Sequence, residues 1–235
     1  MSIARVYDYF NGGKDNYTVD REFAAELTRD HPYLPSLVRD NRAFLKRAVS
    51  FLAHVGIRQF LDIGTGLPTQ ENVHEVAQRI APESRIVYVD CDPTVLTHAR
   101  ALLTSAPEGR TGYVEADARD VETIVREATA AGIDFTRPVA VLLLAILHFL
   151  PDEDATAPTA AFRAAVADGS PLVISHGAPG MRAVADAYQK VSGTGTVREP
   201  EQIRAFFGDW DLYEPGLVPL PGVPQKKHQD ISSLT

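Results

Sequence analysis

Phe60-Leu61-Asp62-Ile63-Gly64-Thr65-Gly66-Leu67-Pro68-Thr69 is the stretch of this sequence that decides the fold. Its first four residues have the composition of a buried strand, and the glycines form a tight turn before a predicted helix at residues 70–80. Glycine is needed there because a side chain would disfavour a positive φ angle and keep a ligand away from the backbone. The pattern departs from the dinucleotide fingerprint G-x-G-x-x-G because Thr69 holds the third glycine position. We therefore expect a ligand that carries a nucleoside but no pyrophosphate.

Strands and helices alternate after this turn. A second strand at residues 85–90 ends in Asp90, about 20–30 residues after the first glycine, where a doubly wound sheet places an acid against a ribose diol. Helices separate the further predicted strands, which lie at residues 111–116, 139–145, 171–176 and, as a short last strand, 210–213. This alternation predicts an α/β protein with a doubly wound, mostly parallel Rossmann-like sheet, covered by helices on both faces.

The chain divides into three predicted parts. Residues 1–56 are expected to form an N-terminal helical extension or lid, residues 57–220 the Rossmann-like domain, and residues 221–235 an unstructured tail rich in Pro and Lys. In the extension, Asp20 is expected to cap a helix that runs to about residue 29, and a longer helix is predicted at 36–55. We interpret the polar face of that longer helix as solvated rather than as a phosphate site; it holds Arg39, Asp40, Arg42, Lys46 and Arg47.

The composition limits the function classes. The 235 residues carry a net charge of −8, which gives no electrostatic drive toward nucleic acid, and no apolar run is long enough for a membrane span. A small-molecule partner is therefore favoured over nucleic acid or a membrane. The one cysteine, Cys91, excludes an intrachain disulfide, and without a Cys/His cluster we expect no metal site. A cytoplasmic location is expected because the N-terminus has no apolar signal core.

Candidate binding residues gather at the predicted ends of the strands. In an open α/β sheet, ligands bind outside the carboxyl ends of the strands, where the strand order reverses. Asp62 with its two following glycines, Asp90, Asp117 and the segment 145–148 all end or follow strands. A single acid at a strand end is usually a helix cap or a solvated residue. Three in succession beside a glycine turn favour one shared binding crevice.

These motifs resemble those of class I S-adenosylmethionine (SAM)-dependent methyltransferases. More narrowly, the chain resembles a bacterial methyltransferase family that has an N-terminal Val-Tyr-Asp-Tyr…Gly-Gly-Lys-Asp-Asn segment, matched here by residues 6–16. Further matches are residues 41–45, 59–69, 87–90 and 141–143, and the likeness extends from about residue 2 to 218.

The resemblance implies a SAM site. Gly64 and Gly66 would let the backbone approach the methionine part, and Asp62 would orient the turn or reach the amino group. Asp90 would accept from the ribose hydroxyls. The remaining implied cofactor-binding residues are Asp117 and Ala118 at the adenine, and Lys14 and Tyr17 from a segment (residues 7–17) that closes over the cofactor, with Lys14 a partner for its carboxylate. A carboxylate suits a diol or an exocyclic amine because it only accepts hydrogen bonds.

Methyl transfer asks the protein chiefly to align a nucleophile and to exclude water, and a general base helps when the acceptor is a hydroxyl or a protonated amine. His148, after the fourth predicted strand, is the best candidate for a catalytic base, and His176 is second. A lone histidine at a strand end is also often a hydrogen-bonded structural residue. Cys91 lies beside Asp90, and adjacent carboxylates disfavour a reactive thiolate.

The C-terminus departs from the resembled family, whose members continue with a Trp-Arg-Pro-Asp-like stretch and a final strand. Residues 221–228 lack that stretch, so we expect an exposed sheet edge that a homodimer or a shortened fold would cover. The leading interpretation is a methyltransferase that acts on a small molecule. Two alternatives stay open: an enzyme that uses SAM without methylating, which would release methylthioadenosine rather than S-adenosylhomocysteine, and a non-catalytic SAM-binding protein. A nicotinamide-dependent oxidoreductase is disfavoured by Thr69.

Overall fold

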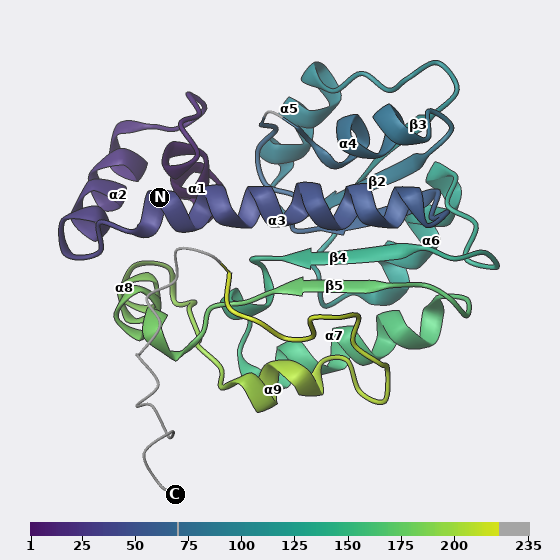
Figure 1. Ribbon diagram of the computed structural model, residues 1–235. Coiled ribbons are helices and arrows are strands. Elements are labelled where there is room, and N and C mark those ends of the chain that lie inside the picture. The colour runs from purple at the N-terminus through teal and green to yellow at the C-terminus, as the bar shows by residue number, and fades with distance from the viewer. Residues whose placement is uncertain (70, 221–235) are drawn as a thin grey trace, which may run out of the picture.

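Five parallel strands form the central sheet of the computed structural model, which describes residues 1–69 and 71–220 (Figure 1). The strands are β1 (Gln59–Ile63), β2 (Arg85–Asp90), β3 (Arg110–Glu115), β4 (Ala140–Leu144) and β5 (Leu172–Ser175). Their order across the sheet is β3-β2-β1-β4-β5, so the strand order reverses between β1 and β4. The predicted doubly wound α/β fold is confirmed, and the predicted ligand edge is the one at which β1, β2 and β4 end.

Alternate side chains of β1 enter two different cores. Phe60 packs with residues of β2, β4, α3 (Leu34–His54) and α4 (Val73–Ile80), whereas Leu61 and Ile63 pack with α6 (Val121–Ala131) and α7 (Asp152–Ala165). Figure 1 shows α3 crossing one face of the sheet and α6 and α7 behind the other. All three side chains are at most 1% exposed, and each contributes about 1.5–3 kcal/mol relative to an exposed position. Burial on both faces explains why residues 60–63 of β1 are apolar apart from Asp62.

Local signals in the sequence set most helix starts. Asn72 caps α4, and the carboxylate of Glu75 accepts from the Asn72 backbone N–H at 2.6 Å. Asp92 caps α5 (Pro93–Leu102), and its carboxylate accepts from the Thr94 N–H. Asp20 helps to cap α2, but as the third helical residue of a capping box rather than as the N-cap residue. Helix α2 runs from Thr18 to Asp30, so Asp20 lies within the first turn, where its carboxylate accepts from the Tyr17 N–H.

The N-terminal helices form a small core of their own. Helix α1 (Ile3–Phe10), α2 and the first half of α3 pack with α8 (Arg182–Ser192) and with Phe149. The second half of α3 belongs to the main sheet core through Leu45, Val49 and Leu52. One continuous helix therefore ties the N-terminal extension rigidly to the sheet, as the long α3 in Figure 1 shows.

The buried Asp8 organises the N-terminal loop of residues 11–16. Its carboxylate accepts from the Asp15 N–H at 3.0 Å and from Nδ2 of Asn16 at 2.8 Å. A Cβ on Gly13 would overlap the Asp8 carboxylate, so glycine is required at this position. Asp8, Gly13 and Asn16 of the N-terminal motif thus have a structural role in shaping the loop.

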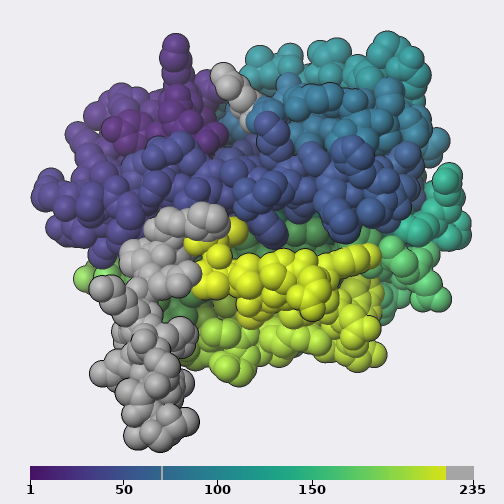
Figure 2. Space-filling view, in the orientation of Figure 1, coloured from purple at the N-terminus to yellow at the C-terminus, as the bar shows by residue number. Residues whose placement is uncertain are grey.

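The short strand predicted at residues 210–213 is not formed. The alternation of Trp210, Asp211, Leu212 and Tyr213 suits a strand, but this segment makes no ladder and crosses instead to α3, where the Tyr213 ring lies 5.7 Å from that of Phe51. In Figures 1 and 2 it appears in yellow beside α3, and it leaves β5 as the edge strand of the described sheet. The predicted tail, residues 221–235, lies outside the described residues. In the described ranges, no helix is both long and apolar enough to cross a membrane.

Candidate functional site

The glycine turn is fastened to the end of β2. The Gly64 and Thr65 N–H groups donate to the Val89 carbonyl at 2.8 and 3.2 Å. The Gly66 N–H donates to Oδ2 of Asp90 at 3.0 Å, while Oδ1 accepts from the Asp92 N–H at 2.9 Å. The Cys91 N–H also lies close enough to lower the pKa of this carboxyl group. The carboxylate therefore supports the turn and keeps acceptor capacity for other donors.

The two glycines serve different purposes. Both have positive φ angles, +70° at Gly64 and +66° at Gly66, which ordinary side chains adopt at a cost. A Cβ on Gly64 would lie 2.7 Å from Cδ1 of Ile146, which follows β4, so this glycine allows close packing between the turn and the next strand. A Cβ on Gly66 would meet nothing within 4 Å. Gly66 therefore borders open space at the crevice.

Asp62 is a buried acid directly beneath the turn. It is 6% exposed, and its Oδ2 accepts from the Thr65 hydroxyl at 2.9 Å. Burial raises the pKa of Asp62 to about 6, and the nearby Asp90 carboxylate raises it too, while the Thr65 hydrogen bond and the Arg42 guanidinium oppose the shift. Asp62 is therefore an acid whose charge changes just below neutral pH.

Part of the polar face of α3 lies near this crevice. Arg42 donates to the Glu71 carbonyl at 3.1 Å and is close enough to Asp62 to lower its pKa. Lys46 pairs with the Glu71 carboxylate at 2.7 Å. The interpretation of this face as merely solvated is therefore wrong for Arg42, which contacts the loop that follows the glycine turn, whereas Lys46 stays exposed in a surface ion pair. A helix face alone does not show what a distant loop will bring against it.

Asp117 lies on the same side of the sheet as Asp90. Desolvation raises the pKa of the Cys91 thiol, and the carboxylates of Asp90 and Asp117 raise it further. Both acids therefore lie near Cys91. Asp117 is held in a fork by Arg119, with contacts of 2.8 and 2.6 Å that lower its pKa. Ala118, between them, is half-buried. Cys91 stays a protonated thiol in these surroundings.

Lys14 and Tyr17 lie at the surface. The Tyr17 ring is 62% exposed and the Arg5 guanidinium lies 4.9 Å from its centroid; Lys14 is exposed in the loop that Asp8 organises. Burial raises the pKa of Asp8 while His98 of α5 opposes the shift, so Asp8 and its loop lie near the middle of α5. The structure therefore brings the loop toward the crevice side, but brings neither predicted side chain into contact with the acids.

His148 lies in a short 3₁₀ turn, η1 (Leu147–Phe149), after β4. Its Nδ1 accepts a hydrogen bond of 3.3 Å from the Gly177 N–H, which places the proton of the neutral ring on Nε2. Desolvation, with the neighbouring His176 and Arg198, lowers the pKa of His148 to about 3. A ring of this tautomer and pKa is a hydrogen-bond donor at neutral pH, and the geometry gives the predicted general-base role no support.

Both ring nitrogens of His176, the second base candidate, make hydrogen bonds within the protein. Its Nδ1 donates to the Gly177 carbonyl at 2.8 Å, and its Nε2 accepts from Arg198 at 2.7 Å. Desolvation and the Arg198 charge lower its pKa to about 4, against the opposing Gly177 hydrogen bond. His176 therefore acts as a structural residue that holds its neighbours in place.

Sequence reasoning missed Arg198, which organises this part of the site. Its side chain is 2% exposed and donates to the carbonyls of Leu147 and Leu150 at 2.8 and 2.9 Å, and its Nε donates to Asp152 at 3.0 Å. Desolvation lowers its pKa. Its partners lie some fifty positions earlier in the chain, so no local pattern could have identified it.

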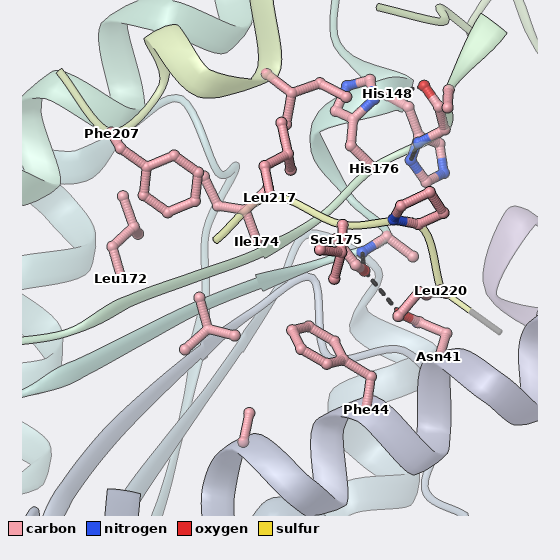
Figure 3. Close-up of a pocket in the computed structure, with 18 of the residues that line it drawn as sticks. Asn41, Phe44, His148, Leu172, Ile174, Ser175, His176, Phe207, Leu217 and Leu220 are labelled. Carbon is pink, nitrogen blue, oxygen red and sulfur yellow. Dashed lines mark hydrogen bonds between the residues drawn. The ribbon is translucent and has the colours of Figure 1, made fainter. Parts of the chain in front are cut away.

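A large cavity of about 1240 Å³ opens beside β5, between α3, α8 and residues 209–220. Figure 3 shows Phe44, Leu172, Ile174, Phe207 and Leu217 around it, with the two histidines at one end. Ala145 lines it as well, and the next residue, Ile146, packs against Gly64. The cavity therefore begins one strand away from the glycine turn.

A chain of hydrogen bonds runs along the wall of this cavity. The Ala145 N–H donates to the Ser175 hydroxyl at 2.9 Å, and that hydroxyl donates to Oδ1 of Asn41 at 2.7 Å (Figure 3). Nδ2 of Asn41 then donates to the Tyr7 hydroxyl at 2.9 Å. The chain connects β4, β5, α3 and α1, and its last proton is that of Tyr7.

A parallel sheet with a glycine turn after β1 and an acid after β2 defines a nucleoside-binding α/β protein. The family model of S-adenosyl methyltransferases matches residues 1–232, so this chain belongs to that family. It is a SAM-dependent methyltransferase, and SAM is its cofactor.

Solved structures agree with this assignment. A DUF574 family protein from Streptomyces avermitilis is 44% identical, with a TM-score of 0.90, over 93% of this chain and 87% of its own. A Thermobifida fusca protein described as a candidate methyltransferase is 42% identical, with a TM-score of 0.88, over 100% of this chain and 90% of its own. A magnesium protoporphyrin IX methyltransferase from Synechocystis with bound SAM shares the fold alone, at 14% identity and a TM-score of 0.50 over 87% and 77% of the two chains. No curated protein matches the chain.

Proposed function

We propose that this enzyme methylates a small molecule and that SAM lies across the carboxyl ends of β1, β2 and β3. The observation that carries the proposal is the open space beside Gly66, bordered by the Asp90 carboxylate that fastens the turn. The residues that would hold the cofactor are those predicted from the sequence: Asp62, Gly64, Gly66, Asp90, Asp117 and Ala118, with the loop that carries Lys14 and Tyr17 closing over it.

The donor and acceptor chemistry of these residues fits SAM. The remaining lone pairs of Asp90 suit the two ribose hydroxyls, which are donors. Asp62 suits the positively charged amino group, since an ionised carboxylate beneath the turn gains a partner there. Asp117 would accept from the adenine amine with the lone pair of Oδ2 that its bonds from Arg119 leave over.

When bound, SAM supplies a methyl group already activated by the sulfonium charge. The work of this chain is then to hold the cofactor, to keep water out and to orient the acceptor. Asp90 and the turn fix one end, and the apolar wall of the cavity excludes water at the other. In this view His148 orients the acceptor by donating from Nε2, and an acceptor that must lose a proton does so before it enters the site.

The large, mostly apolar cavity next to the turn supports a small-molecule acceptor. Calorimetry with SAM, S-adenosylhomocysteine and NADH tests the cofactor half of the proposal, and we expect the first two to bind and NADH not to bind. Mass spectrometry of a reaction with a crude metabolite extract tests the other half. S-adenosylhomocysteine with a mass gain of one methyl in a small molecule is the expected result, whereas methylthioadenosine, or SAM binding without turnover, would contradict it.

A further inference from the structure

The cavity beside β5 carries two polar protons that the described part of the chain does not use. The Tyr7 hydroxyl accepts from Asn41, but its own proton has no acceptor among the described residues. His148 accepts at Nδ1 from Gly177, which leaves Nε2–H without a described partner. Both residues line the cavity. Tyr7 is linked through Asn41 to Ser175, and the His148 ring lies 5.4 Å from that of His176, the next residue, so both donors lie around the end of β5.

Both donors are held in a fixed protonation state. Burial raises the pKa of the Tyr7 phenol, and desolvation lowers that of His148 to about 3, so each group is neutral around pH 7. Tyr7 stands at the end of the hydrogen-bond chain from Ala145, Ser175 and Asn41, and such chains polarise the last donor. Two neutral donors recognise an oxygen acceptor such as a carbonyl or a phenolate.

The rest of the cavity selects for size and apolarity. Aromatic and aliphatic side chains from α3, β5 and the C-terminal segment form its walls, among them Phe44, Phe51, Leu172, Ile174, Phe207 and Leu217. Its volume of about 1240 Å³ exceeds the roughly 300–1,000 Å³ of ordinary small-molecule sites. A single small ring would leave most of this space unfilled, so a larger fused-ring skeleton fits better.

We propose that the methyl acceptor is a bulky, largely apolar ring compound with a hydrogen-bond-accepting oxygen, and that Tyr7 and His148 hold this oxygen with their O–H and Nε2–H groups. This inference rests on the proposed function, because the acceptor must lie next to the bound cofactor. Ile146 provides the link: it packs on Gly64, and the residue before it lines the cavity. Tyr7 and His148 are thus specificity-determining residues of the acceptor site.

Three probe ligands test this proposal. Fluorenone and fluorene differ only in the carbonyl oxygen, and cyclopentanone keeps the carbonyl but lacks the aromatic rings. We expect fluorenone to bind the protein saturated with S-adenosylhomocysteine, fluorene to bind about 5–10-fold more weakly, and cyclopentanone not to bind measurably. Equal affinity for fluorenone and fluorene would overturn the role of the donors. Comparable binding of cyclopentanone would overturn the role of the apolar walls.

Substitutions test whether the two donors, rather than the fold as a whole, cause the preference for fluorenone over fluorene. Tyr7→Phe removes the O–H, and His148→Asn keeps an oxygen for the Gly177 N–H but removes the Nε2 donor, so each should lose the preference for fluorenone over fluorene. His148→Gln, whose amide nitrogen reaches the Nε2 position, should restore it. Tyr33→Phe and His54→Gln, which lie outside the cavity, serve as matched controls and should keep the wild-type ratio.

Binding of SAM to every variant keeps the two proposals distinguishable. If wild-type protein fails to bind SAM, the proposed function fails. If it binds SAM but shows no preference for fluorenone, or if Tyr7→Phe and His148→Asn keep that preference, the acceptor inference alone is overturned.

Discussion

The backbone N–H of Gly66 donates a 3.0 Å hydrogen bond to Oδ2 of Asp90, and this contact joins the turn after β1 to the end of β2. The same carboxylate also accepts from the Asp92 N–H, at the start of α5. A single side chain therefore fixes the shape of the turn and presents acceptors to the crevice. Loss of the Asp90 side chain should therefore disturb both the shape of the turn and the binding of a ligand in the crevice. Different substitutions at this position can separate the two effects.

Asp90→Ala should weaken SAM binding by about 10–100-fold, because it removes a hydrogen-bonded carboxylate worth on the order of 1–3 kcal/mol. Asp90→Asn is the matched control, since its amide oxygen can still accept from the Gly66 N–H and keep the turn. We expect Asn to weaken binding less than Ala does. Calorimetric titration with SAM measures both, and equal affinity of Asp90→Ala and wild type would remove Asp90 from the site.

Alanine at the two glycines should have different effects. Gly64→Ala places a Cβ 2.7 Å from the Ile146 side chain at a φ of +70°, so it should lower thermal stability, and the double variant with Ile146→Ala should recover part of the loss. Gly66→Ala meets nothing within 4 Å and carries only the strain of its φ, about 1–2 kcal/mol. Its Cβ enters the space proposed for the cofactor, so it should fold but lose SAM affinity at least tenfold. Intact SAM binding by Gly66→Ala would place the cofactor elsewhere.

Asp62 should make SAM binding depend on pH. Its pKa is raised from 3.8 to about 6, and only the ionised form attracts the cofactor's amino group. Affinity should therefore be constant above about pH 7 and fall toward tenfold per pH unit below 6. Asp62→Asn should bind weakly and lose most of this dependence. A profile that is the same in wild type and Asp62→Asn would exclude the proposed contact.

The same shift has an opposite effect on the stability of the free protein. A carboxyl group whose pKa is higher in the folded than in the unfolded chain binds its proton more tightly when folded. Its ionisation therefore destabilises the fold as the pH rises from about 4 through 6, by on the order of 3 kcal/mol above pH 7. Asp62→Asn should thus unfold at a higher urea concentration than wild type at pH 8. The difference should disappear near pH 4.

The sheet could be predicted from the sequence because its signals are local. Runs such as residues 59–63 and 85–90 form strands with the predicted bounds, since they are apolar and bounded by glycine or a helix cap. Residues 210–213 show the limit of this reasoning. They alternate like a strand, but pairing depends on a neighbour, and Tyr213 finds Phe51 of α3 instead.

The candidate site was predictable where it depends on strand ends and not where it depends on tertiary contacts. Topology alone brings Asp62, Asp90 and Asp117 to one edge. The tautomer of His148 depends on the backbone of Gly177, a residue 29 positions later, and its position depends on Arg198. Neither relationship leaves a pattern in the sequence. The sequence therefore suggests that His148 is a base, and only the structure shows that its Nδ1 already accepts a hydrogen bond.

Arg198→Met should destabilise the protein strongly. The substitution keeps much of the buried volume but leaves the Leu150 carbonyl without its donor, at about 1–3 kcal/mol, and leaves the Leu147 carbonyl with the Leu150 N–H alone. It also removes the charge that, with burial, lowers the pKa of His176, so that pKa should rise from about 4 toward its ordinary value. Urea unfolding and NMR titration of the histidines measure the two effects.

Asp152→Asn is the control that isolates the carbonyl contacts from the ion pair. The Asp152 side chain is 68% exposed, so its contact with Arg198 resembles a surface salt bridge and should contribute less than about 1 kcal/mol. We expect Asp152→Asn to unfold close to wild type while Arg198→Met does not. Equal destabilisation by the two variants would mean that the ion pair, rather than the bonds to Leu147 and Leu150, fixes the position of His148.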